Sequence, residues 1–290
     1  ELVCISLCIL VKARRGTFLL CPHGPIISSK FKVQSSKEII AELVTYAKAI
    51  AKAEMCQWIR VCPLMIDTPE SRGLFRELGF RAAPIHVHPE ISWMLNLAPS
   101  EDELLSQMRK TTRYSIKKAA KDGVEIVQSN LPQDVERFYQ VYQETVDRQH
   151  FVAFSKNYLS EELAAFREKS SLFFAVYQER VLATAFIVFT DTAGFYHHGA
   201  SSQKESKIPA AYLLQWEAIR EAKRRGCALY NFWGIAPEGK PKHPWAGLSL
   251  FKKGFGGFSE NYVPAQDLVL DKQYWVSYVI EYIRRKKRHL

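Results

Sequence analysis

Three predicted strands follow one another almost without a break, at residues 172–178, 181–190 and 194–199. Each is rich in the apolar, β-branched and aromatic residues that strands favour. The links between them are far too short for a parallel crossover, so the strands are expected to pair as antiparallel hairpins. Helical patterns lie on both sides of them. This half of the chain is therefore expected to be a mixed, mostly antiparallel α/β structure.

The predicted helices of this half flank the three strands. Helical patterns cover residues 101–122, 132–149 and 157–169, with a strand at 124–128. A longer helix runs from about Pro209 to Arg225 and ends at Gly226, a common helix stop. One apolar face of this helix comprises Ala211, Leu214, Ala218, Ile219 and Ala222.

The first half of the chain repeats the mixture of strands and helices. We expect strands near residues 2–12, 17–21 and 58–64, helices near 36–55 and 69–79, and a further strand region near 85–97. We expect two domains: 1–98, completed by 265–290, and 99–264. Because the chain opens on Glu1 inside an apolar run, we expect part of the first domain to be missing upstream.

The net charge indicates which classes of partner the protein binds, and the cysteines indicate the redox state of its compartment. The formal net charge is +10, which favours an anionic partner such as RNA, a phosphorylated metabolite or an anionic membrane surface. The six cysteines form no CxxC pair, which fits a reducing cytoplasm. The apolar run at 2–11 is about half the length that spans a bilayer. The tail at 273–290 is apolar-aromatic and then strongly basic, as in a packing helix or a membrane-surface contact.

Four stretches carry a family resemblance. They are RKTTRYSIKKAAKDGVEI, YHHGASS, IPAAYLLQWEAIREAKRRGCALYNFWGI and GLSLFKKGFGG. Together, in this order and spacing, they closely resemble the FemABX family of aminoacyl-tRNA-dependent transferases, which add amino acids to the peptide of peptidoglycan precursors. The resemblance runs from about Arg109 to Asp267. It implies two domains of the acetyltransferase (GNAT) type, without the long coiled-coil arm of some members.

The resemblance also implies the reaction. The chain is expected to be a cytoplasmic aminoacyltransferase, with possible contact to the inner face of the plasma membrane. It would move an amino acid from aminoacyl-tRNA to a stem-peptide amine of a lipid-linked (lipid II) or UDP-linked precursor. Aminoacyl-tRNA is then a co-substrate, and no cofactor is expected. An ester on tRNA is already activated, so the protein must chiefly position the substrates and stabilise charge.

The segment from Leu250 to Gly257 holds the predicted catalytic residues. The resemblance places Phe251 and Lys252 at the active-site Phe-Lys pair of the family. A fixed ammonium can stabilise the developing oxyanion or hold a phosphate. The alternative is that Lys252 is an ordinary solvated lysine at a strand end, without a catalytic role. Gly254 and Gly256 are predicted to line the substrate site, where glycines let a strand bend around a bulky precursor. The role of Lys253 stays open.

Further substrate-binding residues are assigned by the resemblance. Tyr158 and His198 match family tyrosines near the bound precursor, although His198 itself departs from that tyrosine. Phe154 stands where the family carries a phosphate-binding arginine, and Lys156 is a candidate replacement without the bidentate fork of arginine. Trp233 either lines the pocket or packs in the core. Asn231 replaces an expected aspartate.

Basic and histidine clusters give two more expectations. Lys110, Arg113, Lys117 and Lys121 share one helix face and are candidate contacts for tRNA phosphates, or simply a solvated face. The histidines pair as 86/88 and 197/198, but no third ligand lies at a recognisable spacing. We therefore expect no metal site.

Two other functions remain open. The first is an acyltransferase of the same fold that uses an acyl-CoA donor for another sugar or amine, although the glycines do not match the usual pyrophosphate-binding loop. The second is a basic RNA-binding or membrane-binding relative without activity.

Overall fold

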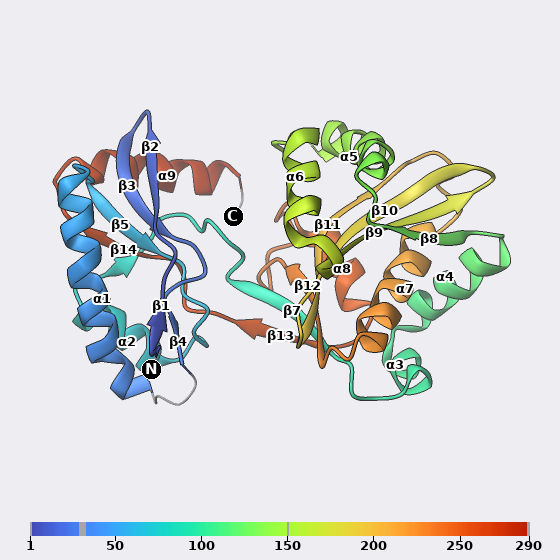
Figure 1. Ribbon diagram of the computed structural model, residues 1–290, viewed down its shortest axis with the longest axis horizontal. Coiled ribbons are helices and arrows are strands. Elements are labelled where there is room, and N and C mark those ends of the chain that lie inside the picture. Colours follow the sequence, from blue (N-terminus) through green and yellow to red (C-terminus); the bar gives the residue numbers. More distant parts are fainter. Residues whose placement is uncertain (1, 29–32, 150, 289–290) are drawn as a thin grey trace. The chain divides into compact units, whose positions relative to one another are not determined.

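The computed structural model describes residues 2–28, 33–149 and 151–288, which form two compact units (Figure 1). Unit 1 comprises the chain up to Ser92, Gly234–Ser249 and the chain from Glu260 onward. Unit 2 comprises Trp93–Trp233 and Leu250–Ser259. The predicted division, 1–98 with 265–290 against 99–264, differs from these units chiefly at Gly234–Ser249.

Unit 1 is built on a five-stranded sheet in the order β2-β3-β5-β14-β6. The C-terminal strand β14 lies between β5 and β6 and is antiparallel to both. The sheet strands are β2 (Ile9–Ala13), β3 (Gly16–Cys21), β5 (Trp58–Val61), β6 (Arg81–Ala82) and β14 (Gln266–Val269). The other elements are β1 (Cys4–Ile5), β4 (Ile26–Ile27), α1 (Val33–Ala53), α2 (Pro69–Glu77) and α9 (Tyr274–Lys287).

A buried ion pair joins the two ends of the chain within unit 1. The guanidinium of Arg60 on β5 donates to both carboxylate oxygens of Asp267 on β14, at 2.7 and 2.8 Å. Their side chains are 2% and 0% exposed. Tyr274 donates a further hydrogen bond to Asp267, and Glu281 on α9 accepts from Arg60. The C-terminal segment is thus held in the N-terminal sheet by charge as well as by strand pairing.

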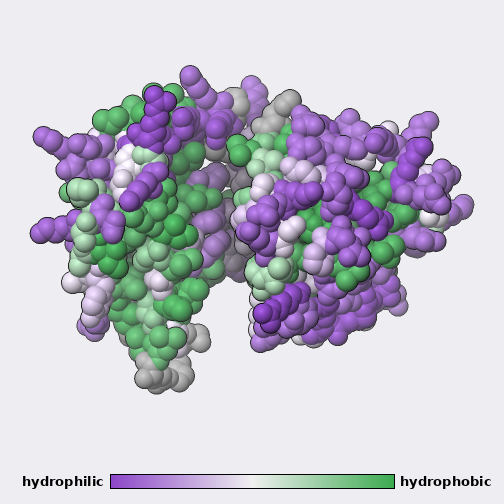
Figure 2. Space-filling model, turned by 45° about the horizontal axis from the view of Figure 1, so that its top comes forward, coloured by the Kyte–Doolittle hydropathy of each residue, from purple (hydrophilic) through white to green (hydrophobic). Residues whose placement is uncertain are grey.

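Hydrophobic side chains are also exposed on unit 1. Figure 2 shows hydrophobic residues gathered on its visible face. Most exposed among the N-terminal ones are Leu2, Ile5, Leu7 and Ile26, each more than half exposed. On α9 the exposed apolar residues are Trp275, Val276, Val279, Tyr282 and Ile283.

The larger sheet has seven strands in the order β13-β7-β12-β11-β10-β9-β8. Its strands are β7 (Ile91–Asn96), β8 (Glu125–Ser129), β9 (Ser170–Tyr177), β10 (Arg180–Phe189), β11 (Ala193–Ser201), β12 (Leu229–Gly234) and β13 (Phe258–Asn261). The helices are α3 (Glu101–Gln107), α4 (Lys110–Lys121), α5 (Val135–Gln149), α6 (Lys156–Phe166), α7 (Ala210–Arg224) and α8 (Ala246–Lys253), with short 3₁₀ turns at Pro132–Asp134 and Arg167–Lys169.

The three-strand prediction is confirmed as β9, β10 and β11, which pair antiparallel. Most described pairs are antiparallel, with parallel pairing at β3–β5 and β11–β12. The predicted long helix is α7, whose apolar face packs in the main core of unit 2. The mixed, mostly antiparallel α/β class is therefore confirmed. The longest helix in the described residues is α1, with 21 residues, so they contain no long coiled-coil arm.

Three predicted elements are wrong. The strand expected near residues 2–12 is divided into β1 and β2, which belong to different sheets. The helix expected at 101–122 is broken into α3 and α4, because Met108 and Arg109 have extended backbone. The break lets the Arg109 amide donate to the carbonyl of Gly254, at 3.0 Å. The segment expected as a strand around Lys252 is the helix α8, and the glycines follow its end.

No helix within the described ranges is both long and apolar enough to cross a membrane.

Replacing Asp267 with asparagine tests the buried ion pair. Asp267→Asn leaves the Arg60 charge with Glu281 as its remaining carboxylate, and a buried charge that loses its partner costs about 3 kcal/mol or more. We expect a loss of this size in the free energy of unfolding, measured by urea titration.

Glu77→Gln is the matched control. It removes one carboxylate from the exposed Lys37–Glu77 pair, where ion pairs contribute little. Equal urea midpoints for the two variants would contradict a stabilising role for the Arg60–Asp267 pair.

Candidate functional site

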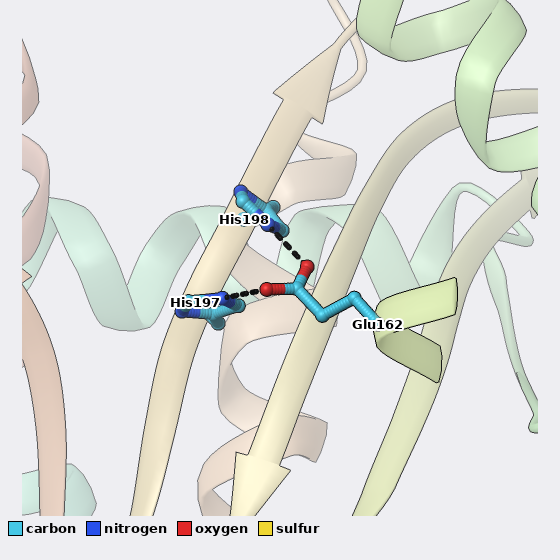
Figure 3. A group of neighbouring side chains, drawn as sticks. All are labelled: Glu162, His197 and His198. Carbon is cyan, nitrogen blue, oxygen red and sulfur yellow. Dashed lines mark hydrogen bonds and ion pairs between the residues drawn. The ribbon is translucent and has the colours of Figure 1, made fainter. Parts of the chain in front are cut away.

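A β-bulge brings two neighbouring histidines to the same side of the sheet. Successive residues of a regular strand point to opposite faces. In the β10–β11 pairing, Phe186 lies opposite His198 and Ile187 lies opposite Tyr196, so His197 is an extra residue on β11. Such a bulge re-aims a side chain. Figure 3 shows both imidazoles directed toward Glu162, and their ring centroids lie 4.2 Å apart.

Glu162 reaches the histidines from α6. The Ser155 hydroxyl caps this helix by accepting from the Tyr158 amide, and Leu159 and Leu163 anchor its apolar face in a buried cluster. Glu162 lies between these two leucines in sequence and directs its carboxylate at β11. Each carboxylate oxygen meets one imidazole: Oε1 lies 2.7 Å from His197 Nε2, and Oε2 lies 2.8 Å from His198 Nε2.

The cluster is largely withdrawn from water. The side chains of Glu162 and His198 are each 10% exposed, and that of His197 is 24% exposed. Burial alone would raise the pKa of Glu162, but the hydrogen bonds from the two histidines outweigh it and lower the pKa to about 2. Burial lowers the pKa of His198, although Glu162 opposes this. At neutral pH, an ionised carboxylate therefore accepts an N–H from a neutral His198.

Aromatic rings surround the cluster. Phe154 stacks on Tyr158 with centroids 4.6 Å apart, and its ring lies 5.4 Å from that of His198. The Trp233 ring meets the His197 ring edge-on at 5.9 Å. The structure thus brings together the predicted residues Tyr158, His198 and Trp233 through contacts that include Phe154 and His197.

Trp233 has an unusual backbone. Its φ of +68° lies in the left-handed region, which residues other than glycine rarely adopt. The side chain of Asn231 supports this turn by accepting from the Trp233 amide at 2.7 Å. Outliers of this kind cluster at functional sites. Trp233 is also partly exposed, whereas Tyr230 is fully buried and its hydroxyl oxygen accepts a hydrogen bond from the side-chain amide of Gln215.

Lys156 lies apart from these contacts. Its side chain is more than half exposed, and its ammonium pairs with Glu136 on α5 at 2.8 Å. This candidate phosphate ligand therefore pairs with an acidic side chain outside the histidine cluster.

Lys252 lies in the last turn of α8 and is buried, with 4% of the residue exposed. Burial lowers the pKa of its ammonium to about 7. The neighbouring Phe251 packs edge-on against Tyr212 and Phe255, and Lys253 stands over the Trp93 ring at 5.3 Å. A buried lysine that changes charge near neutral pH is a recognised sign of a functional group.

The glycines after α8 allow close packing. A Cβ on Gly254 would lie 2.5 Å from the Thr112 hydroxyl, and one on Gly257 would lie 2.1 Å from the Met94 carbonyl oxygen. Gly256 has a φ of +80°, and its carbonyl accepts from the Trp93 indole at 2.7 Å. These contacts give Gly254 and Gly256 structural reasons to be glycine, beside their predicted role toward substrate.

The basic helix face is only partly free to meet RNA. Lys110, Lys117 and Lys121 are exposed on α4. Arg113, by contrast, donates to the carbonyls of Ser106 and Met108 at the end of α3. Three of the four predicted residues thus present charge to solvent, and Arg113 stabilises the junction of α3 and α4.

Sequence reasoning missed Glu162. Within the described residues, Glu162, His197 and His198 are the group of three ligand-type side chains close enough to hold one metal ion. The carboxylate comes from 35 residues upstream of His197, so no spacing motif reveals it. The available signal was its position four residues after Tyr158, on the same face of the predicted helix. The rings of His86 and His88 instead lie tilted against those of Trp245 and His23, respectively.

Similar proteins have known activities. Lipid II:glycine glycyltransferase of Staphylococcus epidermidis is 20% identical, over 82% of this chain and 74% of that protein. The protein of the same name from Staphylococcus aureus is 22% identical, over 85% of this chain and 77% of that protein.

Solved structures share the fold. A crystal structure of FemX matches 97% of this chain and 88% of that chain, with a TM-score of 0.82 and 18% identity. A tandem GNAT protein from the clavulanic acid biosynthesis pathway matches 88% of this chain and 77% of that chain, with a TM-score of 0.52 and 9% identity. The predicted GNAT-type architecture is thus confirmed. The FemAB family model matches residues 78–180 and 174–281, which together span most of the chain, so this protein belongs to the FemAB family.

Proposed function

We propose that this protein transfers an amino acid from aminoacyl-tRNA to a side-chain amine of a lipid-linked peptidoglycan stem peptide, and so builds an interpeptide bridge. Its class, an aminoacyltransferase, follows from the FemAB family and from relatives named glycyltransferases. The names of those relatives also support lipid II as the acceptor. The tRNA donor rests on the motif resemblance and on the net charge of +10.

The reaction requires a neutral amine and a stabilised oxyanion. The amine nitrogen attacks the ester carbon, a C–N bond forms, and the negative charge gathers on the carbonyl oxygen. The C–O bond to the tRNA ribose then breaks, and a proton passes from the former amine to the leaving oxygen. Holding the amine and the ester in line supplies much of the rate, because it replaces an encounter in solution.

Lys252 is the proposed cation that stabilises the oxyanion. The observation that carries this assignment is its burial in the Phe-Lys motif, with a pKa lowered to about 7. An ammonium withdrawn from water interacts more strongly with a nearby negative charge than a solvated one does. Phe251 holds the adjacent turn in the core through Tyr212 and Phe255.

The exposed lysines of α4 are the proposed tRNA contacts. Lys110, Lys117 and Lys121 repeat at helical spacing and form one exposed basic face of α4. The phosphates of the tRNA backbone would bind along this face. The aromatic and histidine cluster around Trp233 and His198 is proposed to receive the precursor. It combines the exposed rings of Phe154 and Tyr158 with the largely buried polar groups of Glu162 and His198.

Donor and acceptor can be identified in one assay. We expect label from a pool of aminoacyl-tRNAs to reach lipid II more readily than the UDP-linked precursor, and ribonuclease to abolish transfer.

Replacing Lys110, Lys117 and Lys121 with glutamine should weaken aminoacyl-tRNA binding. It should also lower the slope of log affinity against log salt concentration by about 2, since each phosphate contact releases counterions. The same change at the exposed Lys12, Lys48 and Lys52 of unit 1 is the control. Transfer from acyl-CoA that survives ribonuclease would refute the proposed donor.

Lys252 gives a pH prediction. Below pH 7, Lys252 is protonated and kcat/KM rises tenfold per pH unit, because the neutral fraction of the acceptor amine rises. Above about pH 7, the protonated fraction of Lys252 falls by the same factor as the neutral fraction of the acceptor amine rises. The profile of kcat/KM against pH therefore levels off. Lys252→Arg stays charged, and its profile should keep rising past pH 7. Lys252→Ala should lower kcat by about 10²–10³, as for loss of an oxyanion-hole donor.

Two comparisons make the Lys252 test decisive. The exposed Lys272→Ala should leave the rate near that of the parent. A general base at position 252 would give the same levelling in the parent, but arginine could not replace it. An inactive, folded Lys252→Arg together with an inactive Lys252→Ala would therefore contradict the cation role.

We also propose that α9 contacts an anionic membrane surface. Val276, Val279 and Ile283 lie at i, i+3 and i+7 and are about half exposed or more, and basic residues fill the last turn. An apolar stripe beside a basic cluster is typical of helices that lie on membranes. This contact would bring the protein to the membrane that holds a lipid-linked acceptor.

Vesicle flotation tests the contact. Replacing Arg284, Lys286 and Lys287 with glutamine should reduce recovery on phosphatidylglycerol vesicles at least tenfold, since each basic residue near the surface contributes about 1 kcal/mol. Recovery on phosphatidylcholine vesicles should be low for parent and variant alike. Equal recovery of parent and variant on anionic vesicles would remove α9 as the contact.

A further inference from the structure

Three ligand-type side chains converge in unit 2 from two separate elements. One nitrogen of each histidine and a carboxylate oxygen of Glu162 all lie within 4.8 Å of one another. The earlier expectation of no metal rested on the lack of a third ligand near the His197/His198 pair. The fold supplies that third ligand from α6.

The cluster stands on rigid elements. β11 lies inside the seven-stranded sheet, between β12 and β10, and the bulge there fixes the directions of His197 and His198. The helix that carries Glu162 is held by Leu159 and Leu163, which are 1% and 2% exposed. Ligands placed on a strand and a helix hold their geometry better than ligands on loops.

We propose that Glu162, His197 and His198 form a binding site for a divalent transition-metal ion, with Zn²⁺ as the preferred ion. Two imidazoles and one carboxylate are a known ligand set for zinc sites that keep a position open. The same set also serves non-haem iron, but nitrogen and oxygen sites generally bind Zn²⁺ more tightly than Fe²⁺. The inference stands independently of the proposed aminoacyl transfer.

Only a small rearrangement is needed to admit the ion. The two Nε2 atoms now lie 2.7 and 2.8 Å from the carboxylate oxygens. Zinc at 2.0–2.2 Å from each ligand atom sets neighbouring ligand atoms about 3.3 Å apart. An imidazole that shares the ion with its present carboxylate oxygen must therefore move back by about half an ångström. The three ligand atoms now lie within 4.8 Å of one another and must settle at about the tetrahedral separation. The ion takes the place of the Nε2 protons, and each neutral imidazole then carries its proton on Nδ1.

The three protein ligands leave one position of a tetrahedral ion for water or for an oxygen of a bound molecule. The hydroxyl of Tyr158 lies 3.5 Å from Glu162 Oε1, at the polar edge of the cluster. It is placed to hydrogen-bond a water on the ion. The Phe154 ring lies against His198, and the Trp233 ring lies against His197, so aromatic rings border the cluster at both histidines.

Metal binding by the full chain, without an affinity tag, tests the site. After treatment with chelator, we expect the protein to bind one equivalent of Zn²⁺ by calorimetry. Co²⁺ should give a visible absorption band that Zn²⁺ removes. Glu162→Gln and His198→Gln should each weaken Zn²⁺ binding at least tenfold, with folding checked by circular dichroism.

Glu161→Gln is the matched control, because it removes the same charge from the adjacent, exposed residue of α6. It should bind Zn²⁺ like the parent. Equal Zn²⁺ affinity in Glu162→Gln and Glu161→Gln would overturn the site, as would a folded parent that binds neither Zn²⁺ nor Co²⁺ at micromolar concentration. Tighter binding of Fe²⁺ than of Zn²⁺, measured without oxygen, would overturn the choice of ion.

Discussion

The close approach of Gly254 to the first turn of α4 is the constraint on which the site around Lys252 depends. The Arg109 amide donates to the Gly254 carbonyl, and the Thr112 hydroxyl occupies the space that a side chain at position 254 would need. The Arg109 guanidinium also donates to the Leu250 carbonyl. These contacts tie the end of α8 to α4. Phe255, fully buried next to Phe251, fixes the same segment from the core side.

This packing has an electrostatic consequence for Lys252. The lysine follows Phe251 into the interior, and loss of water lowers the pKa of its ammonium to about 7. Burying a lysine works against stability, because the charged form loses its hydration. Such a cost is usually found where function requires the group. Membership of the FemAB family indicates which reaction this group would serve, namely the transfer of an aminoacyl group.

A second constraint shapes the other part of the candidate site. In a regular strand, His197 and His198 would point to opposite faces, and Glu162 would meet one of them at most. The bulge in β11 places both against the same carboxylate. The positive φ of Trp233, on the neighbouring strand β12, brings another aromatic ring to His197. Both features are local departures from regular sheet, and together they concentrate polar and aromatic groups in one place.

The sequence predicted what depends on local pattern. The strands β9–β11 and the helix α7 follow from apolar periodicity and short links, and the mixed α/β class follows from their order. The break at Met108 and Arg109 was missed because it is fixed by a hydrogen bond to Gly254, far along the chain. The eight-residue helix α8 has too few turns for a clear periodic signal. Glu162 was missed for the same reason as the break: its partners are distant in sequence and meet it only in the fold.

The most direct test of the central claim is the titration of the Lys252 side chain itself. Lysine Nζ resonances of the ¹⁵N-labelled protein, with Lys252 assigned by comparison with Lys252→Arg, report its protonation as the pH is varied. The account predicts a midpoint near pH 7. A midpoint close to the ordinary lysine value of about 10.4 would show a solvated ammonium and contradict the account.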